Sequence, residues 1–415
     1  MFCLLKIQQI LHKACSCYNK NAMNLDSAID SFLSPIADKI SGIIFSHVTI
    51  CGVRVEFLIA LLMCAAFYFT IRTRFIGVWG FKHALKLITK NYEHKDIIVR
   101  KKKGEVSSFQ ALTATISASA GIGNVAGSAA AVSVGGPGVI FWMIIAGFFS
   151  MALKFAEVLL GLKFRQVNKD GSVAGGPMYY IQAGLKNHKI LGRFAPHLAK
   201  LYAVSCIFAM IGGWNLFQIN AMTTQITEVT GGENSFFANQ SWLLGLIVAV
   251  ITYFTIIGGI KAIGKFTSKV TPVMCTLYVA SAFVVCLMNI HHLPHTIHVI
   301  LAEAFKPRAM EGGMFACMLW GFRRAMFANE SGLGTAPIAF SAVKTNKPVA
   351  QAFIAMLQPF VDTVIVGSAT AFVIVVSGVY LQTNGLAGIE LTSKAFGTVC
   401  PFFPILLTIM ASCFV

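Results

Sequence analysis

The sequence has 415 residues, of which 56% are hydrophobic and 12% are charged, and its mean hydropathy is +0.72. A single water-soluble core would use fewer apolar side chains, so we expect lipid to be the solvent for much of the chain. In a soluble protein the formal net charge of +17 would suggest a nucleic-acid partner. Here the cations lie between apolar stretches instead of forming one basic face, which argues against nucleic acid and favours a role in membrane topology.

Apolar stretches recur along the chain at a length that suits membrane helices. A helix that crosses a hydrocarbon layer about 30 Å thick needs about 20 apolar residues. The stretches lie at about 51–72, 107–134, 137–165, 199–227, 240–259, 266–290, 312–342, 350–380 and 397–415. We therefore predict an all-α polytopic membrane protein. Residues 1–50 are mixed in character and lack a clear signal peptide, so they are expected to form an interfacial lead.

The basic residues orient these stretches. The connection from Arg72 to Lys103 contains ten Lys or Arg residues, which assigns it to the cytoplasm by the positive-inside rule. The ends near Lys163, Lys261 and Lys344 are also basic, while two of the alternate connections contain no Lys or Arg. This alternation predicts an N-terminus outside the cell and a span at 312–342 that runs inward from the outer face.

The span at 107–134 contains residues that a lipid-facing helix avoids. In the run TATISASAGIGNVAG, small hydroxyl residues lead into Gly121, Gly123 and Asn124. Glycine costs about 1 kcal/mol in a helix interior relative to alanine, so this run favours local unwinding. In a membrane, unwound backbone is tolerated where it lines a cavity or meets a ligand. Close helix packing through small residues is the alternative interpretation.

A second interruption is expected in residues 316–337. Trp320, Gly321 and Phe322 precede two arginines, and further polar and glycine residues follow them. An aromatic pocket floor at a break near Gly321, followed by a charged cytoplasmic half-helix, accounts for this pattern. Ordinary packing of the two aromatic side chains is the alternative.

The two interruptions begin the first and the sixth spans after the basic connection. One span enters from the cytoplasm and the other from outside, so the two sets of helices would be inverted relative to each other, as in transporters with a site near the midplane. We therefore divide the chain into a lead at 1–50, an extra helix with the basic connection at 51–106, a first five-helix repeat at 107–290 and a second, inverted repeat at 312–415.

Other polar residues inside apolar stretches are weaker candidates. Gln218 suits a ligand contact and an interhelical hydrogen bond equally well. Asp362 is an intramembrane carboxylate and therefore a functional candidate, although an ion pair with an arginine is an alternative. Glu157, together with Lys154 and Arg165, more closely fits a structural ion network.

Several runs together resemble a known family. They are ASAGIGNVAG, GGPGVIFWMIIAGFFSMALKFAEVLLGLKFR, GGPMYYIQAGL, RRAMFANESGLGTAPIAFSAVKT and FVDTVIV. These runs are similar to the alanine or glycine:cation symporter family of bacteria and archaea, from about residue 51 to the end. The resemblance implies the LeuT-type fold with one extra N-terminal helix, and sodium-coupled uptake of alanine or glycine across the inner (plasma) membrane. It also implies that sodium is the coupling ion, that there is no other cofactor and that the protein is not an enzyme.

The resemblance also implies which residues bind. For the amino acid they are Gly121, Ile122, Gly123, Asn124, Gln218, Trp320, Gly321 and Phe322. For sodium they are Ser117 and Ala120, through their carbonyls, with Ser412 and Cys413. Hard cations prefer oxygen ligands, which agrees with the carbonyls.

Three features depart from the family pattern. Ile122 stands where the family commonly has Thr, and Cys413 stands where it tends to have Thr, although sulfur is a poor sodium ligand. The chain also stops at Val415 inside an apolar segment, so we expect a truncated second repeat that is cut within its third helix.

Three functions remain open from the sequence. The leading hypothesis is a symporter that alternates access and whose partners are a small amino acid, sodium and the lipid bilayer, with no nucleic acid. The alternative is a truncated, transport-inactive membrane remnant of such a carrier. An intramembrane enzyme has less support, because no nucleophile, base and orienting group can be grouped from the spacing.

Overall fold

The computed structural model describes residues 31, 34–35, 38–42, 46–50, 53–89, 104–169, 172–238, 240–306, 313–381, 388–399 and 401–414. The chain divides into two compact units, Met1–Cys64 and Ala65–Val415. In the first unit, β1 (His47–Ile50) pairs with β2 (Val53–Glu56) as an antiparallel hairpin. Most of the predicted interfacial lead lies outside the described residues.

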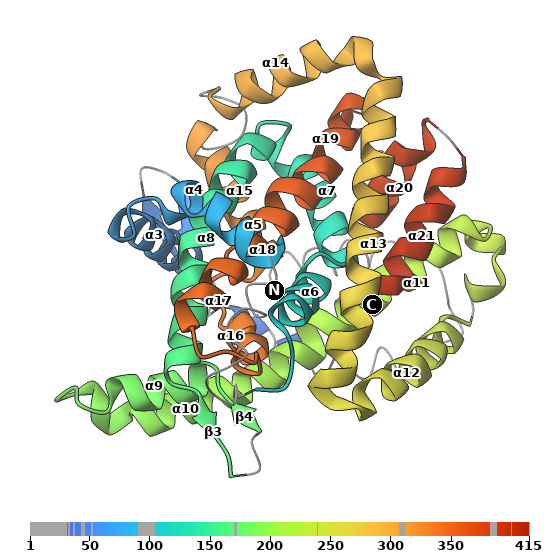
Figure 1. Cartoon of the computed structure of the whole chain (residues 1–415). Helices are drawn as coiled ribbons and strands as arrows, with labels where there is room; N and C mark the ends of the chain where they lie inside the picture. Colours follow the sequence, from blue (N-terminus) through green and yellow to red (C-terminus); the bar gives the residue numbers. More distant parts are fainter. Residues whose placement is uncertain are drawn as a thin grey trace. The chain divides into compact units, whose positions relative to one another are not determined.

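The second unit is built mainly from helices (Figure 1). After α3 (Phe57–Arg72), the elements are α4 (Ile76–Trp79), α5 (Phe81–Thr89), α6 (Ser108–Ser119), α7 (Ile122–Gly135), α8 (Val139–Lys163), β3 (Gln166–Val167), β4 (Val173–Ala174), α9 (Pro177–Leu185), α10 (Leu191–Ala209), the π-helical segment η1 (Met210–Asn215), α11 (Leu216–Val229), α12 (Ser241–Ile257), α13 (Gly259–Met288), α14 (Leu293–Ala304), α15 (Gly313–Asn329), α16 (Thr335–Ser341), α17 (Pro348–Ala355), α18 (Leu357–Pro359), the π-helical segment η5 (Phe360–Gly367), α19 (Ser368–Val376), α20 (Ile389–Gly397) and α21 (Phe402–Phe414). Short 3-10 turns occur at Gly232–Asn234, Phe236–Ala238, Ile290–His292 and Val379–Leu381.

Within the described residues, four helical stretches are long and apolar enough to cross a membrane: Val139–Lys163, Leu191–Val229, Gly259–Met288 and Pro348–Val376. Shorter apolar helices lie at Phe57–Arg72, Ile122–Gly135 and Ser241–Ile257. The expected spans at 107–134 and 312–342 are not among the long stretches, because each is interrupted. The all-α membrane architecture is confirmed by these elements.

The long stretches differ in how much of each is buried inside the protein. The most apolar window is 61% buried in Val139–Lys163 and 67% buried in Pro348–Val376, but 11% buried in Leu191–Val229. Helix α8 contacts α14, α15, α16, α17 and η5, which places it in the interior of the unit. The outer helices expose apolar side chains, as helices in contact with lipid do.

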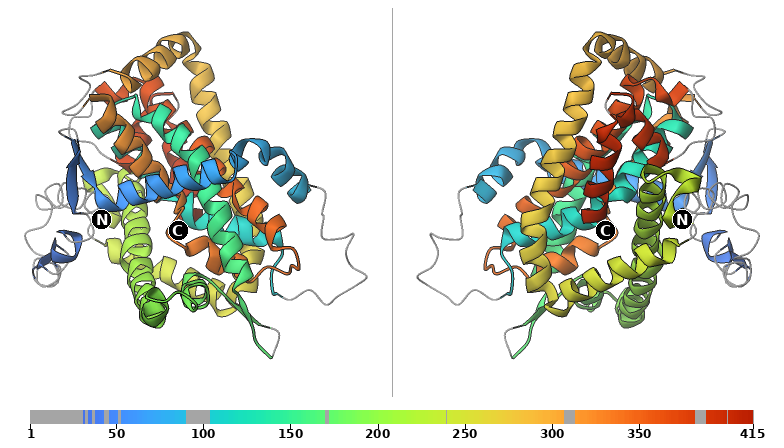
Figure 2. Two further views of the ribbon diagram at one scale, coloured as in Figure 1. Left: turned by 90° about the vertical axis from the view of Figure 1, so that its left-hand side faces the viewer. Right: turned by 90° about the vertical axis from the view of Figure 1, so that its right-hand side faces the viewer.

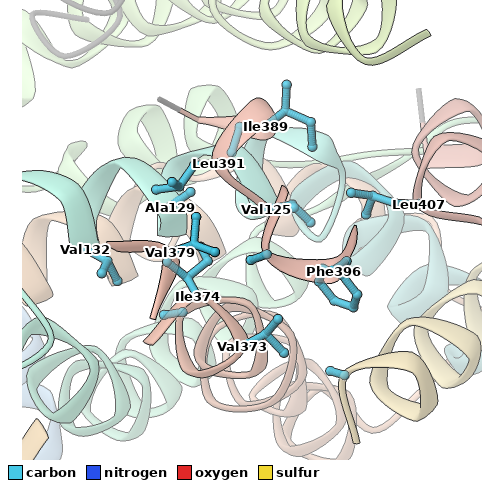
Figure 3. Packing of buried hydrophobic residues seen from close by; sticks show 14 of the residues in the cluster. Val125, Ala129, Val132, Val373, Ile374, Val379, Ile389, Leu391, Phe396 and Leu407 are labelled. Carbon is cyan, nitrogen blue, oxygen red and sulfur yellow. The ribbon is translucent and has the colours of Figure 1, made fainter. Parts of the chain in front are cut away.

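An apolar cluster joins the segment after the first interruption to the end of the described chain (Figure 3). Helix α7 contributes Val125, Ala129 and Val132, α19 contributes Val373 and Ile374, α20 contributes Ile389, Leu391 and Phe396, and α21 contributes Leu407. This packing fixes α7 against the helices that follow η5, and thereby positions the candidate site.

Helix α14 and the β3–β4 hairpin lie at opposite ends of the unit (Figures 1 and 2). At the hairpin end, the guanidinium of Arg165 donates to the carbonyl oxygens of Ser341, Val343 and Thr345, each at 2.8 Å. Val106 also forms a parallel bridge with Val343. Arg165 and Val106, which adjoin connections that the charge pattern assigns to the cytoplasm, therefore both contact the segment 341–345 at this end.

Gly321 lets α15 approach α8 closely. A Cβ atom at Gly321 would lie against the Trp142 Cβ atom and 3.0 Å from the Trp142 carbonyl carbon, neither of which can move freely. Gly321→Ala is therefore expected to lower the free energy of unfolding by about 1–3 kcal/mol, a typical cost of overpacking. Thermal or denaturant unfolding of the detergent-purified protein measures this loss.

Gly245→Ala is the matched control, since a Cβ atom at Gly245 in α12 would meet nothing within 4 Å. It is expected to leave stability unchanged or to raise it slightly. Equal stability of the two variants would contradict the close packing of α15 on α8.

Candidate functional site

The span at 107–134 is broken where the sequence predicts it. Helix α6 begins with a capping box at Ser107 and ends at Ser119, where Ala120 donates to the Ile116 carbonyl. Gly121 is extended, with φ −64° and ψ −169°, and α7 begins at Ile122. The structure confirms this interruption. The last carbonyls of α6 and the first N–H groups of α7 are consequently left without a continuing helical turn.

The second break lies later than expected. Helix α15 continues through Gly321 to Asn329, and the chain then turns before α16. Positive φ angles of 54° at Glu330, 86° at Gly332 and 82° at Gly334 make this turn. The prediction of a break at Gly321 is therefore wrong. That glycine serves close packing, and the glycines after Asn329 supply the backbone freedom that the turn needs.

The first break is joined to η5 by Asp362. The side-chain amide of Asn124 donates to the Asp362 carbonyl oxygen at 2.6 Å, and the Ser119 hydroxyl donates to the Asp362 carboxylate. Gly367 leaves the room that these groups require, because a Cβ atom there would lie 3.2 Å from Asn124 Oδ1 and 3.4 Å from Ser128 Oγ. A π-helical turn thus lies directly against an unwound helix, and π-helical turns are frequent at functional sites.

Gln358 links the two breaks to each other. Its side-chain amide donates to Ser119 Oγ at 3.0 Å and to the Asn329 carbonyl at 3.4 Å. The Asn329 side chain donates in turn to Thr363 Oγ1 at 3.0 Å and accepts from the Ser331 N–H at 3.0 Å. All five of these residues are buried. They form a continuous polar seam between the two interrupted helices and η5.

Arg324 is the side chain of α15 that hydrogen-bonds to the first break. Its Nη2 atom donates to the Gly123 carbonyl at 3.1 Å, to the Asn124 carbonyl at 2.6 Å and to Asn124 Oδ1 at 2.8 Å. Gly127 admits the guanidinium, since a Cβ atom there would overlap Arg324. The sequence alone gave no signal for this pairing, which joins residues 200 positions apart.

The three predicted pocket residues of α15 face different neighbours. Trp320 lies beside Gly135 at the far end of α7, and the Arg323 guanidinium stacks on its ring at 4.9 Å. Gly321 faces α8. Phe322 is fully buried, and its ring centroid is 5.6 Å from that of Phe67. Successive residues of an unbroken helix point about 100° apart, which is why these three face different neighbours.

Gln218 lies near the first break. It is half-buried on α11, a helix that packs against α7, and its neighbour Phe217 covers Gly123, where a Cβ atom would lie 3.2 Å from the ring. The Gln218 Oε1 atom is buried and accepts no hydrogen bond within the described part of the chain. The structure thus brings Gln218 into the neighbourhood of the Gly121–Asn124 segment.

The residues predicted to bind sodium lie on two separate helices. Ser117 and Ala120 lie at the end of α6, while Ser412 and Cys413 are exposed on α21. Ser412 Oγ donates to the Thr408 carbonyl of its own helix at 2.8 Å. Both α6 and α21 pack against α13, and among the described residues no hydrogen bond joins the two pairs.

A buried ion network lies next to the second break. Lys154 Nζ is 2.9 Å from Glu157 Oε1 and donates to the Glu330 carbonyl at 3.2 Å. Glu157 Oε2 accepts from the Gly332 N–H at 2.9 Å. The predicted pairing of Lys154 with Glu157 is confirmed. Arg165, which was expected in the same network, bonds instead to carbonyls at the hairpin end.

The Lys154–Glu157 pair predicts a non-additive pair of substitutions. Lys154→Met leaves a buried carboxylate without its cation, so we expect it to lower the free energy of unfolding by about 3–5 kcal/mol. Adding Glu157→Gln removes that charge and keeps an acceptor for Gly332, so the double variant is expected to be more stable than Lys154→Met alone. A double-mutant cycle of unfolding measures the coupling, and additive losses would contradict the network.

Comparison with known proteins agrees with this architecture. The chain matches the Sodium:alanine symporter family over residues 41–415. The sodium/alanine symporter AgcS of Methanococcus maripaludis is 35% identical over 85% of this chain and 75% of its own length. Two Bacillus subtilis proteins are similar over 83% of the chain. They are the putative sodium/proton-dependent alanine carrier protein YrbD, 31% identical over 69% of its length, and the probable sodium/glutamine symporter GlnT, 33% identical over 67%.

The family match runs to residue 415, so it does not support the expected truncation. The relatives of this chain are named as carriers, which agrees with the apolar helices of the structure. The chain belongs to the sodium:alanine symporter family, a family of multi-pass membrane transporters and not of enzymes.

Proposed function

We propose that this protein takes up a small neutral amino acid, alanine or glycine, together with sodium by alternating access across the plasma membrane. The observation that supports this most strongly is the polar seam, which joins the two interrupted helices to η5 through Gln358 and Thr363. In carriers built from inverted repeats, broken helices bind the substrate and the coupling ion near the midplane. The proposal includes the LeuT-type arrangement and an N-terminus outside the cell.

The first turn of α7 is suited to a carboxylate. The N–H groups of Ile122 and Gly123 follow the break and have no preceding turn to which they can donate. The positive end of the helix dipole adds attraction for an anion. We therefore assign the substrate carboxylate to Gly121, Ile122 and Gly123, with Asn124 beside them.

Gln218 and Phe217 favour a small ammonium-bearing substrate. The Gln218 Oε1 atom is a buried acceptor without a partner in the described part of the chain, which suits the amino group of the substrate. The Phe217 ring lies against Gly123, where an added Cβ atom would be 3.2 Å from it, so we expect it to limit the size of the substrate side chain. Arg324 bonds to the break directly, and we assign it the role of holding the break in shape.

Uptake into proteoliposomes tests the function. An inward sodium gradient is expected to raise the initial rate of labelled alanine uptake at least tenfold over a choline gradient. An inside-negative potential should raise it further, because each co-transported charge gains about 2.3 kcal/mol per 100 mV. Unlabelled glycine should compete, and glutamine, which is in the name of one relative, should compete poorly. Uptake that is equal in sodium and choline would contradict sodium coupling.

Arg324 provides a second test, with its neighbour as control. Arg324→Gln loses donors to three oxygens of the break. Hydrogen bonds from charged groups contribute about 1.5–3 kcal/mol each, so we expect the apparent KM for the amino acid to rise at least tenfold. Arg323→Gln, which removes a cation stacked on Trp320, is expected to change KM less than threefold. Equal KM values for the two variants would show that Arg324 does not organise the break.

A further inference from the structure

The turn between α9 and α10 and the first half of α10 carry cations without anionic partners. Lys186 and Lys189 lie in the turn, and Arg193 and Lys200 lie on α10. All four are exposed, and within the described part of the chain none of them forms an ion pair. From residue 171 to residue 227 the sequence contains no Asp or Glu. The positive charge of this surface is therefore not balanced by its own segment.

Helical spacing gathers the basic side chains of α10 on one face. Arg193, His197 and Lys200 stand at positions i, i+4 and i+7, so they follow one another along the same side of the helix. All three are exposed. The distance from the first to the last is about 10 Å along the helix axis. This basic stripe continues the positive surface that begins in the turn.

An apolar stripe lies beside the basic stripe. Phe194, Leu198 and Leu201 repeat the same spacing one residue further along α10, and they are 56%, 39% and 62% exposed. A step of one residue turns the side chain by about 100°, so the two stripes are neighbours on the helix surface. An exposed apolar face next to a basic face is typical of helices that lie at the boundary between acyl chains and headgroups.

This surface lies at an end of the unit where headgroups are expected. Helix α9, the start of α10 and the β3–β4 hairpin lie at the same end, opposite α14 (Figures 1 and 2). Lys163 and Lys169, between α8 and the hairpin, add exposed cations there. In the proposed orientation this end faces the cytoplasm, where anionic lipids give the leaflet a negative surface potential. The charge and the hydropathy of the surface both complement an anionic phospholipid.

We propose that the two stripes of α10, together with the α9–α10 turn, bind an anionic phospholipid. The cations contact the phosphate of the headgroup, and the acyl chains lie along the apolar stripe. The Tyr202 hydroxyl on the same helix donates to the Leu333 carbonyl at 2.9 Å. The lipid therefore binds to a helix that also contacts the turn of the second break. The proposal does not depend on the identity of the amino acid or of the coupling ion.

A tryptophan in the apolar stripe can report which lipid lies there. The full chain with Phe194→Trp is reconstituted in vesicles of phosphatidylethanolamine and phosphatidylglycerol, and in each sample one of the two lipids is brominated so that it quenches tryptophan fluorescence. The signal is the quenching in this variant minus that in the unsubstituted protein. The preference for phosphatidylglycerol is expected to be at least fivefold, because cations near the surface attract anionic lipid. Leu198→Trp, one turn away, replaces the reporter if Phe194→Trp does not fold.

Two charge variants of the reporter protein decide the question. Arg193→Gln with Lys200→Gln removes both permanent charges of the basic stripe, so the preference for phosphatidylglycerol should fall at least threefold. Lys306→Gln with Lys394→Gln is the matched control, since it removes the same charge from exposed positions outside this surface, and it should leave the preference unchanged. An undiminished preference in the first variant, or an equal loss in the control, overturns the proposal. Quenching by neither lipid also overturns it, because the surface would then be covered by protein.

Discussion

The interaction on which the candidate site depends is the contact of Asp362 with the first break. Ser119 and Asn124 stand on either side of the unwound turn, and both donate to Asp362, one to its carboxylate and one to its carbonyl. A membrane helix cannot leave freed backbone groups in lipid. These contacts, together with those of Arg324, satisfy polar groups of the break and hold it inside the protein.

The same constraint explains the unusual backbone around the site. Segment η5 is π-helical where it carries Asp362, and η1 is π-helical just before Phe217, which covers Gly123. A regular α-helix in place of η5 or η1 would point Asp362 or Phe217 in a different direction. The apolar cluster of α7, α19, α20 and α21 includes Val366 of η5, so it packs against that irregular segment. Packed α-helices thus support the irregular backbone around the break, as a carrier site requires.

Local features of the sequence predicted part of this arrangement. Gly121 and Gly123 predicted the first break, because glycine disfavours the helical conformation locally. The apolar stretches predicted the all-α membrane class. Gly321 led to the wrong prediction of a break, because a glycine can either interrupt a helix or allow a neighbouring helix to pack closely. Only the position of α8 in the structure shows that Gly321 allows close packing. The partners of Ser119 and Arg324 lie about 200 positions away or more, and pairings at such distances follow from tertiary packing that no local pattern encodes.

The central claim is that the amino-acid substrate binds at the first break, next to the polar seam. A high-resolution electron cryomicroscopy map of the full chain, prepared with alanine and sodium, tests it most directly. We expect amino-acid density with its carboxylate at the first turn of α7. Amino-acid density beside Trp320 and Gly135, away from the first break, would contradict it.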